Sequence, residues 1–288
     1  MAFETVVLSA IDPFQCREFS LTTGTLSHPA GHYHRRQAPT DPAVPSTPSS
    51  SSTSTSSSSS GSAGSSSSAS SSSSSSSGGY STAGFGASTA HSGADITYKG
   101  NVGNPWGSNI IEVSSGSADS YQHVLEISGQ NTEPWTVVFW NKYGPDGQMT
   151  GWYGNSALTL TVNSGETKYV ALADDSNGGF AAAPSSSGIP TDNAGGYAST
   201  WGEFDFSSAG NAGWSGFDVS AIAAQNAGLP VQGMKICDAA SGTCSSITKD
   251  AATVDNAYTS AETDIGGIGG NIAGGGQVKL AVTLDYSA

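Results

Sequence analysis

From residue 96 onward, apolar and polar residues alternate over short runs that are separated by Gly, Asn, Asp and Pro. A period of two places successive side chains on opposite faces of a β-strand. The pattern predicts ten strands and one or two short helices. The expected strands are 109–113, 122–128, 134–143, 148–153, 157–162, 167–173, 200–206, 216–223, 231–237 and 277–286; the expected helices are 220–228, with Ser220 as its cap, and 251–262. So many strands with so little helix predict an all-β fold, a β-sandwich or barrel.

Turn residues between neighbouring runs predict two hairpins. Pro145-Asp146-Gly147 separates 134–143 from 148–153, and Asn163-Ser164-Gly165 separates 157–162 from 167–173. Pro fixes φ for a turn, and Gly tolerates the positive φ that many turns require. The Gly-rich stretch 266–276 lacks the Lys-Ser/Thr of a phosphate loop and is expected to be a surface loop.

The stretch GEFDF carries the most informative alternation in the chain. Glu203 and Asp205 fall on one face of the expected strand, and Phe204 and Phe206 fall on the other. The next run, GFDVSAI, places Asp218 in the same way. If the two strands are neighbours, the three carboxylates share one surface over an aromatic floor, and this surface is the best candidate for a functional cleft.

Composition divides the chain into three parts. Residues 1–45 form an N-terminal arm, 46–78 are almost unbroken Ser, and 79–288 contain all six Trp residues. The Ser tract has no apolar face to bury, so it is expected to stay disordered as a stalk that is O-glycosylated. The remaining 210 residues are enough for one hydrophobic core.

The arm gives mixed signs of secretion. No secretory signal peptide is visible in its first 30 residues, and one hypothesis is that the leader is missing from this translated start through a gene-model error. Arg35-Arg36 is a dibasic pair of the kind that processing proteases cut; the alternative is two exposed arginines in a disordered arm.

Charge and cysteine content restrict the partners and the compartment. Residues 79–288 contain six Lys, no Arg and nineteen Asp plus Glu, so nucleic acid and anionic membrane surfaces are poor partners, whereas neutral polysaccharides are compatible. Cys237 and Cys244 flank a short loop, which predicts a disulfide in an oxidising compartment; two reduced buried thiols are the alternative. His91 and His123 stand alone, so no metal or cofactor is expected.

Two kinds of side chain could bind or hydrolyse a sugar. Glu203 and Asp218 are the carboxylate pair whose strand placement suits glycoside hydrolysis, and the alternative is that both are ordinary surface or turn residues. Aromatic rings next to Gly could stack on pyranose faces, with core packing as their alternative. The candidate ligand-binding residues are Trp152, Tyr153, Trp201, Glu203, Asp205, Trp214 and Asp218.

Several long segments resemble the fungal Asp f 4 allergen family. They include YKGNVGNPWGSNIIEV, EPWTVVFWNKYGPDGQMTGWYGNSALTLTVNSGETKYVA, GGYASTWGEFDF, GWSGFDVSAIAAQNAG, VQGMKIC and LAVTLDY, and the likeness runs from about residue 84 to 286. The resemblance implies a secreted protein that human IgE binds and that has no settled biochemical activity.

The stretch 200–237 also resembles thaumatin-like proteins, through GEF, FDVS, NAGLP and Cys237. This likeness implies a thaumatin-like β-sandwich, in which Glu203 and Asp218 match two carboxylates of an acidic cleft that is thought to bind β-1,3-glucan. The next Asp of that cleft is Ala223 here, and the domain has no Arg to supply the cleft's cation. The resemblance therefore supports the fold more than an enzymatic activity.

Together these observations predict a secreted or cell-wall-associated fungal protein that binds wall polysaccharide such as β-glucan without catalysis. Two alternatives stay open. One is a weak endo-β-1,3-glucanase that uses Glu203 and Asp218 as catalytic residues, and the other is a structural wall protein without a ligand.

Overall fold

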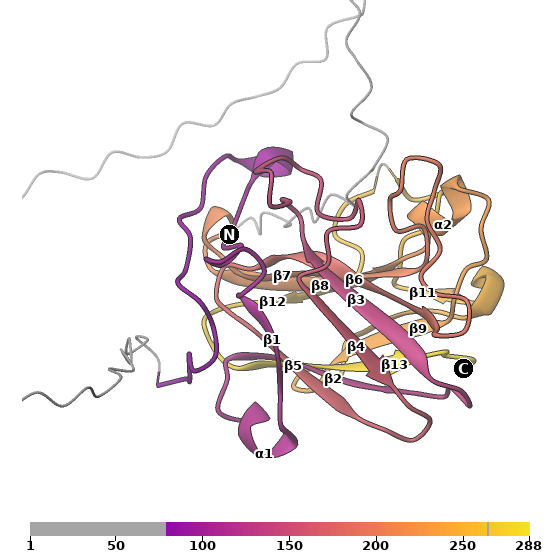
Figure 1. Cartoon of the computed structure of the whole chain (residues 1–288), viewed down its shortest axis with the longest axis horizontal. Helices are drawn as coiled ribbons and strands as arrows, with labels where there is room; N and C mark the ends of the chain where they lie inside the picture. Colours follow the sequence, from indigo (N-terminus) through magenta and orange to yellow (C-terminus); the bar gives the residue numbers. More distant parts are fainter. Residues whose placement is uncertain (1–78, 264) are drawn as a thin grey trace, which may run out of the picture. The chain divides into compact units, whose positions relative to one another are not determined.

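The computed structural model describes residues 79–263 and 265–288, which form thirteen strands and a few short helices (Figure 1). The expected arm, the Ser-rich stalk and the Arg35-Arg36 site lie outside the described residues. The strands are β1 Ile110–Val113, β2 His123–Gly129, β3 Trp135–Asn141, β4 Leu158–Val162, β5 Lys168–Leu172, β6 Asn177–Pro184, β7 Trp201–Ser208, β8 Trp214–Ser220, β9 Met234–Asp238, β10 Cys244–Ile247, β11 Val254–Asp255, β12 Gly270–Ile272 and β13 Val278–Leu284. The α-helices are α1 Ser115–Ala118 and α2 Ile222–Asn226, and 3-10 turns occupy Asp95–Thr97, Ala209–Asn211 and Lys249–Ala251.

The strands form two sheets around one main core, which confirms the predicted two-layer all-β fold. The seven-stranded sheet has the order β1-β5-β2-β13-β9-β10-β11, and the six-stranded sheet has the order β12-β8-β7-β6-β3-β4. Side chains of both sheets share the main core cluster, for example Leu125 and Val282 of the first sheet with Phe139 and Phe217 of the second. The core therefore lies between the sheets, and each sheet has a second face that points away from it.

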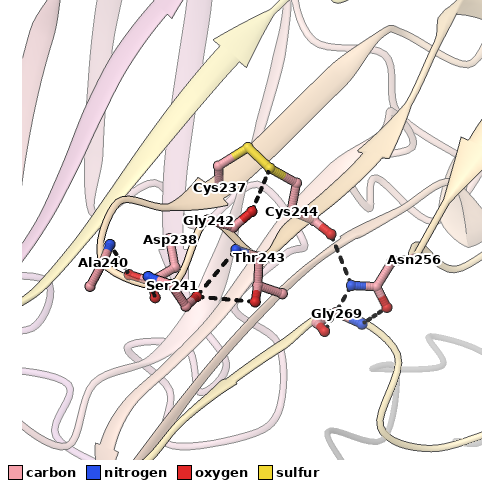
Figure 2. The surroundings of a disulfide bond; sticks show 9 residues. All are labelled: Cys237, Asp238, Ala240, Ser241, Gly242, Thr243, Cys244, Asn256 and Gly269. Carbon is pink, nitrogen blue, oxygen red and sulfur yellow. Dashed lines mark hydrogen bonds between the residues drawn. A yellow bond between two sulfur atoms is a disulfide. The ribbon is translucent and has the colours of Figure 1, made fainter.

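The predicted disulfide is present. Cys237 of β9 and Cys244 of β10 are directly opposite in the antiparallel ladder, with their Cα atoms 4.1 Å apart. Figure 2 shows how the loop between them is also held by Asp238, whose carboxylate accepts hydrogen bonds from the backbone N–H groups of Ala240 and Ser241. The crosslink thus fastens a hairpin that already has its own turn.

The predicted hairpin between 157–162 and 167–173 is wrong, although both strands exist. β4 pairs with β3 in the six-stranded sheet, whereas β5 pairs with β1 and β2 in the other sheet. Leu160 of β4 and Val170 of β5 belong to the same core cluster. The turn at Asn163 therefore carries the chain from one sheet to the other, so that the apolar faces meet across the core.

Two other predicted elements are absent from the described residues. The expected strand 148–153 is a set of turns, in which the Asp146 carboxylate accepts hydrogen bonds from the Gln148 N–H and the Thr150 hydroxyl. The expected helix 251–262 is broken by positive φ values at Ala251 and Asn256, which an α-helix does not accommodate. Its residues instead complete a 3-10 turn at Ala251, form β11, and pass through an isolated bridge at Tyr258 into a turn.

Four strands were not predicted, and glycine explains two of them. β6 reads NGGFAAAP, which has low β-propensity, and β12 lies inside the Gly-rich stretch that was expected to be a loop. In β6 a Cβ on Gly178 would lie 2.0 Å from the Trp140 carbonyl oxygen, and in β12 a Cβ on Gly270 would lie 2.1 Å from the Phe217 ring. These glycines allow close packing and weaken the local strand signal.

The predicted short helix after β8 is confirmed as α2. The prediction of Ser220 as its cap is wrong, because Ala221 is the N-cap and has no side-chain cap; the Ser220 hydroxyl accepts a hydrogen bond from the Ile222 N–H at 3.4 Å. Figure 1 places α1 and α2 at opposite corners of the domain. Among the described residues, no helix has the length and apolar character needed to cross a membrane.

Candidate functional site

The outer face of the six-stranded sheet carries the three carboxylates that the sequence pattern placed together. β7 and β8 are antiparallel neighbours, and Glu203 lies directly opposite Asp218. Phe204, Phe206 and Phe217 point the other way and belong to the main core. The predicted alternation is therefore confirmed, including the aromatic layer beneath the carboxylates. We call the outer-face residues Lys142, Glu203, Asp205 and Asp218 the acidic face.

Glu203 and Asp218 form a closed pair in the middle of this face. Glu203 is 3% exposed and Asp218 is fully buried. Burial, the nearby Glu203 charge and a hydrogen bond with Glu203 raise the pKa of Asp218 well above 3.8. Asp218 thus keeps its proton well above the ordinary range of an aspartic acid and can donate it toward Glu203.

The C-terminal part of the chain covers this closed pair. Tyr258 is fully buried, its pKa is raised first by burial and also by the charges of Asp218 and Glu203, and its hydroxyl accepts the Ile268 N–H at 3.2 Å. Gly269 has φ of +100°, and a Cβ there would lie 2.7 Å from the Asp218 Cβ. The backbone next to Ile268 is therefore packed directly against the pair.

Aromatic side chains cover the end of the outer face next to Glu203. Trp201, two residues before Glu203 on β7, is 2% exposed, and its ring contacts those of Trp140 and Trp152 at centroid distances of 5.1 and 6.1 Å. Its indole N–H donates to the Tyr197 carbonyl at 2.8 Å. Trp152 is also buried.

The sequence-predicted aromatic residues therefore divide into two groups. Trp201 and Trp152 follow the core-packing alternative, because their rings fill the space over the outer face. Tyr153 and Trp214 are partly exposed and keep a surface position. Their part in sugar binding stays a prediction.

The other end of the acidic face is more open. Asp205 is partly exposed, and burial of its carboxyl group raises its pKa to about 7, while the hydroxyl of Ser208 and the charge of Lys142 lower it. Its Oδ1 atom is buried and has no protein hydrogen-bond donor among the described residues. Asp205 is thus a polar group that the fold leaves incompletely satisfied.

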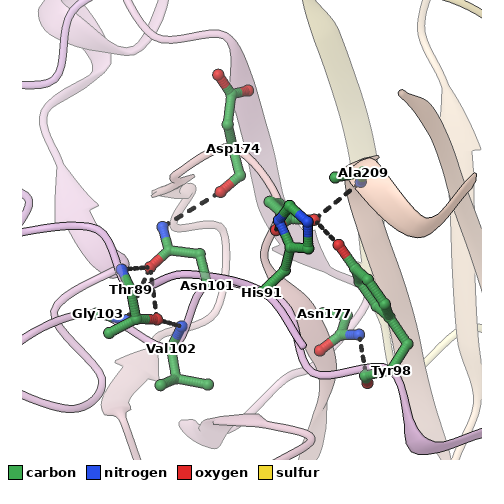
Figure 3. Close-up of polar contacts among 10 residues, drawn as sticks. Thr89, His91, Tyr98, Asn101, Val102, Gly103, Asp174, Asn177 and Ala209 are labelled. Atoms are coloured by element: carbon green, nitrogen blue, oxygen red, sulfur yellow. Dashed lines mark hydrogen bonds and ion pairs between the residues drawn. The ribbon is translucent and has the colours of Figure 1, made fainter. Parts of the chain in front are cut away.

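A polar cluster adjoins Asp205 at the surface. The Tyr98 hydroxyl donates to Asp175 Oδ1 at 2.6 Å, and His91 Nδ1 lies 3.6 Å from Asp175 Oδ2. Burial, followed by this hydrogen bond, raises the pKa of Tyr98 to about 12. The His91 side chain is 58% exposed, and Figure 3 shows His91, Tyr98, Asn177 and Ala209 gathered at this point.

Sequence reasoning missed two residues of this region, Lys142 and Asn177. Val138 and Trp140 lie on the outer face. The same alternation extends to Lys142, so the strand pattern could have predicted that Lys142 lies on the outer face too. Lys142 is 7% exposed, and burial lowers its pKa against the opposing charges of Asp205 and Glu203. Asn177 begins β6, the Gly-rich strand that lacked a pattern; the sequence indicated an oxygen-bearing side chain in a turn there and did not place it on this face.

Fold and site together define a two-sheet, disulfide-containing β-sandwich with a partly buried row of ionisable side chains on one outer face. A family model for the Allergen Asp f 4-like domain matches residues 108–284. The chain belongs to this family.

A curated relative and a solved structure add detail. The chain is 56% identical over 209 residues to "Allergen Asp f 4" of Aspergillus fumigatus, and the match covers 73% of this chain and 64% of that protein. The chain thus matches somewhat less than two thirds of the relative's length. The crystal structure of the protein elicitor MoHrip2 from Magnaporthe oryzae is 12% identical, with a TM-score of 0.35, over 57% of this chain and 99% of that one. This second likeness is too low to support an argument.

Proposed function

We propose that this protein is secreted or cell-wall-associated and binds a wall polysaccharide such as β-glucan without catalysis, through the open end of its acidic face. The observation that supports this proposal is the row Lys142, Glu203, Asp205 and Asp218 on a face that the main core does not need. Burying ionisable groups costs free energy, and perturbed carboxylates are concentrated at functional sites. Asp205 is the member of the row that reaches the surface.

Secretion and the allergen character are supported by other features. The Cys237–Cys244 disulfide suits an oxidising compartment. Membership in the allergen family supports recognition of this chain by host IgE. Residues 79–288 carry a formal charge of −13, which disfavours anionic partners and leaves neutral polysaccharide compatible.

A retention assay on insoluble β-1,3-glucan tests the binding proposal. The full chain is expected to sediment with the particles and to be released by soluble β-1,3-glucan, but not by a soluble α-glucan. Glu126→Gln is a matched control, because Glu126 is exposed on β2 of the other sheet. Failure of the unmodified chain to sediment would end the proposal.

The glucanase alternative receives less support from the geometry. Retaining and inverting glycosidases hold their two carboxyl groups about 5 Å or about 6.5–9.5 Å apart, on either side of the scissile bond. Glu203 and Asp218 are instead hydrogen-bonded to each other and covered, with no room for a sugar between them. Release of reducing sugar by the full chain, lost in Glu203→Gln, would reverse this preference.

A ligand-free structural wall protein is the remaining alternative. Under that alternative the acidic face has no partner, and no polysaccharide would retain the chain. The same sedimentation assay, repeated with other insoluble wall polysaccharides, distinguishes it from the binding proposal.

A further inference from the structure

Three residues, two from the adjacent strands β6 and β7 and one directly after β3, meet at the open end of the acidic face. Asn177 of β6 lies directly opposite Asp205 of β7, and the Lys142 N–H donates to the Asn177 carbonyl at 3.0 Å. Directly opposite side chains on one face of a sheet have Cβ atoms about 4.5–5.5 Å apart. The strand pairing therefore places the Asn177 amide, the Asp205 carboxylate and the Lys142 side chain next to one another.

Each of these side chains has a polar group that the described protein residues do not satisfy. Asn177 is 8% exposed and its amide N–H donates to the Tyr98 carbonyl at 3.5 Å, yet its Oδ1 accepts no hydrogen bond within the described part of the chain. Asp205 Oδ1 is likewise buried and accepts no hydrogen bond from the described residues. Buried acceptors of this kind are uncommon in folded proteins and require an explanation.

Lys142 provides the complementary group. It is almost fully buried, and among the described residues no carboxylate oxygen lies within the 4.0 Å of an ion pair to it. Asp205 and Glu203 interact with it only through their charges at longer range. The cluster thus presents two acceptors and one strong donor, none of which is satisfied by its neighbours.

We infer that Asn177, Asp205 and Lys142 form a subsite for a pair of adjacent hydroxyl groups on a neutral sugar ring. A hydroxyl both donates and accepts, so one can donate to Asp205 Oδ1 while its neighbour accepts from the Lys142 ammonium and donates to Asn177 Oδ1. Asp205 is partly exposed, so this end of the acidic face reaches the surface. This inference rests on the proposed polysaccharide binding and specifies where and how the sugar is held.

The charges around the subsite disfavour acidic sugars. A uronic acid would bring its carboxylate close to Asp205 and Asp175, in a domain whose formal charge is already −13. Like charges at close range reduce affinity, so an acidic sugar should bind more weakly than a neutral glucan. The carboxylates therefore act as specificity determinants against acidic sugars.

Calorimetric titration of the full chain with a soluble β-1,3-glucan oligosaccharide tests the subsite. Asp205→Asn and Lys142→Met should each weaken binding by about tenfold or more, because a hydrogen bond to a charged group is lost while a partner stays buried. Glu126→Gln is the matched control and should bind like the unmodified chain. An oligogalacturonate serves as the acidic probe and should bind more weakly than the neutral oligosaccharide.

The outcomes separate this inference from the function on which it rests. If the unmodified chain binds none of the neutral oligosaccharide, the proposed function and the subsite both fail. If it binds, but Asp205→Asn and Lys142→Met bind equally well, the proposed function stands and the subsite is overturned. Preference for the oligogalacturonate would also overturn the subsite, and thermal unfolding of each variant shows whether a loss of binding reflects a loss of fold.

Discussion

The closed pair and the open end of the acidic face lie only one alternation apart on β7, yet they differ in how far they are covered and in what lies opposite them. Glu203 faces Asp218, both side chains are buried, and a hydrogen bond between them contributes to the raised pKa of Asp218. Asp205 faces the amide of Asn177 and is partly exposed. The difference indicates that a carboxylate can be buried on this face for two purposes. The pair completes the fold, and the open end is available to a ligand.

Removing one member of the closed pair should give the largest effect on stability. Asp218→Ala removes the donor to Glu203 and leaves a buried carboxylate with a cavity beside it, so we expect the free energy of unfolding to fall by about 3–5 kcal/mol. Asp218→Asn keeps a donor of the same shape and should cost about 1 kcal/mol or less. Chemical denaturation measures both. Equal losses for the two variants would contradict the protonated, donating state of Asp218.

At the open end, replacing Asp205 should raise the free energy of unfolding at neutral and alkaline pH, whereas replacing Asp218 lowers it. The pKa of Asp205 is about 7 in the folded chain and about 3.9 when unfolded, so between these values the folded state binds more protons. Its contribution to stability therefore falls as pH rises from about 4 to 7. Asp205→Asn removes this loss, and the variant should be more stable than the unmodified chain by about 2 kcal/mol at pH 8.

The measurement is the difference between the two unfolding curves at each pH, because another group titrates in the same range. His123 is buried and stacked on Phe206, and burial lowers its pKa to about 4 from 6.5. The stability that the neutral, buried His123 contributes is lost as pH falls from 6.5 to about 4. The loss that Asp205 causes occurs instead as pH rises. The His123 effect cancels in the difference, whereas a difference that does not change with pH would contradict the assignment to Asp205.

The sequence was sufficient to predict which face carries the carboxylates, but not which other residues surround them. Alternation in GEFDF and GFDVS correctly placed Glu203, Asp205 and Asp218 on one face, because a strand has a fixed period of two. It could not show which carboxylate is covered, since the cover comes from Tyr258 and Gly269, far along the chain. The predicted helix over Tyr258 was wrong for a related reason, because positive φ at Asn256 depends on tertiary contacts.

The sequence did not place Asn177 at the open end for a different physical reason. Asn177 lies on a strand of Gly and Ala whose side chains supply no periodic signal, and the close approach of Trp140 requires that composition. Trp201 and Trp152 carried a strong signal for binding or core packing, and only the packing of the loops over the outer face shows that they are buried. Local pattern thus gives the face of a residue, and long-range packing determines its exposure.

The most direct test of the contrast between the two carboxylate environments is an NMR titration of the side-chain carboxyl groups, with and without a soluble β-1,3-glucan oligosaccharide. We expect Asp205 to titrate near pH 7 and its signal to shift when the sugar is added, while Asp218 stays protonated well above pH 4 and is unchanged by the sugar. Asp205 titrating near pH 4, or a sugar-induced shift at Asp218 with none at Asp205, would contradict the division into a closed pair and an open end.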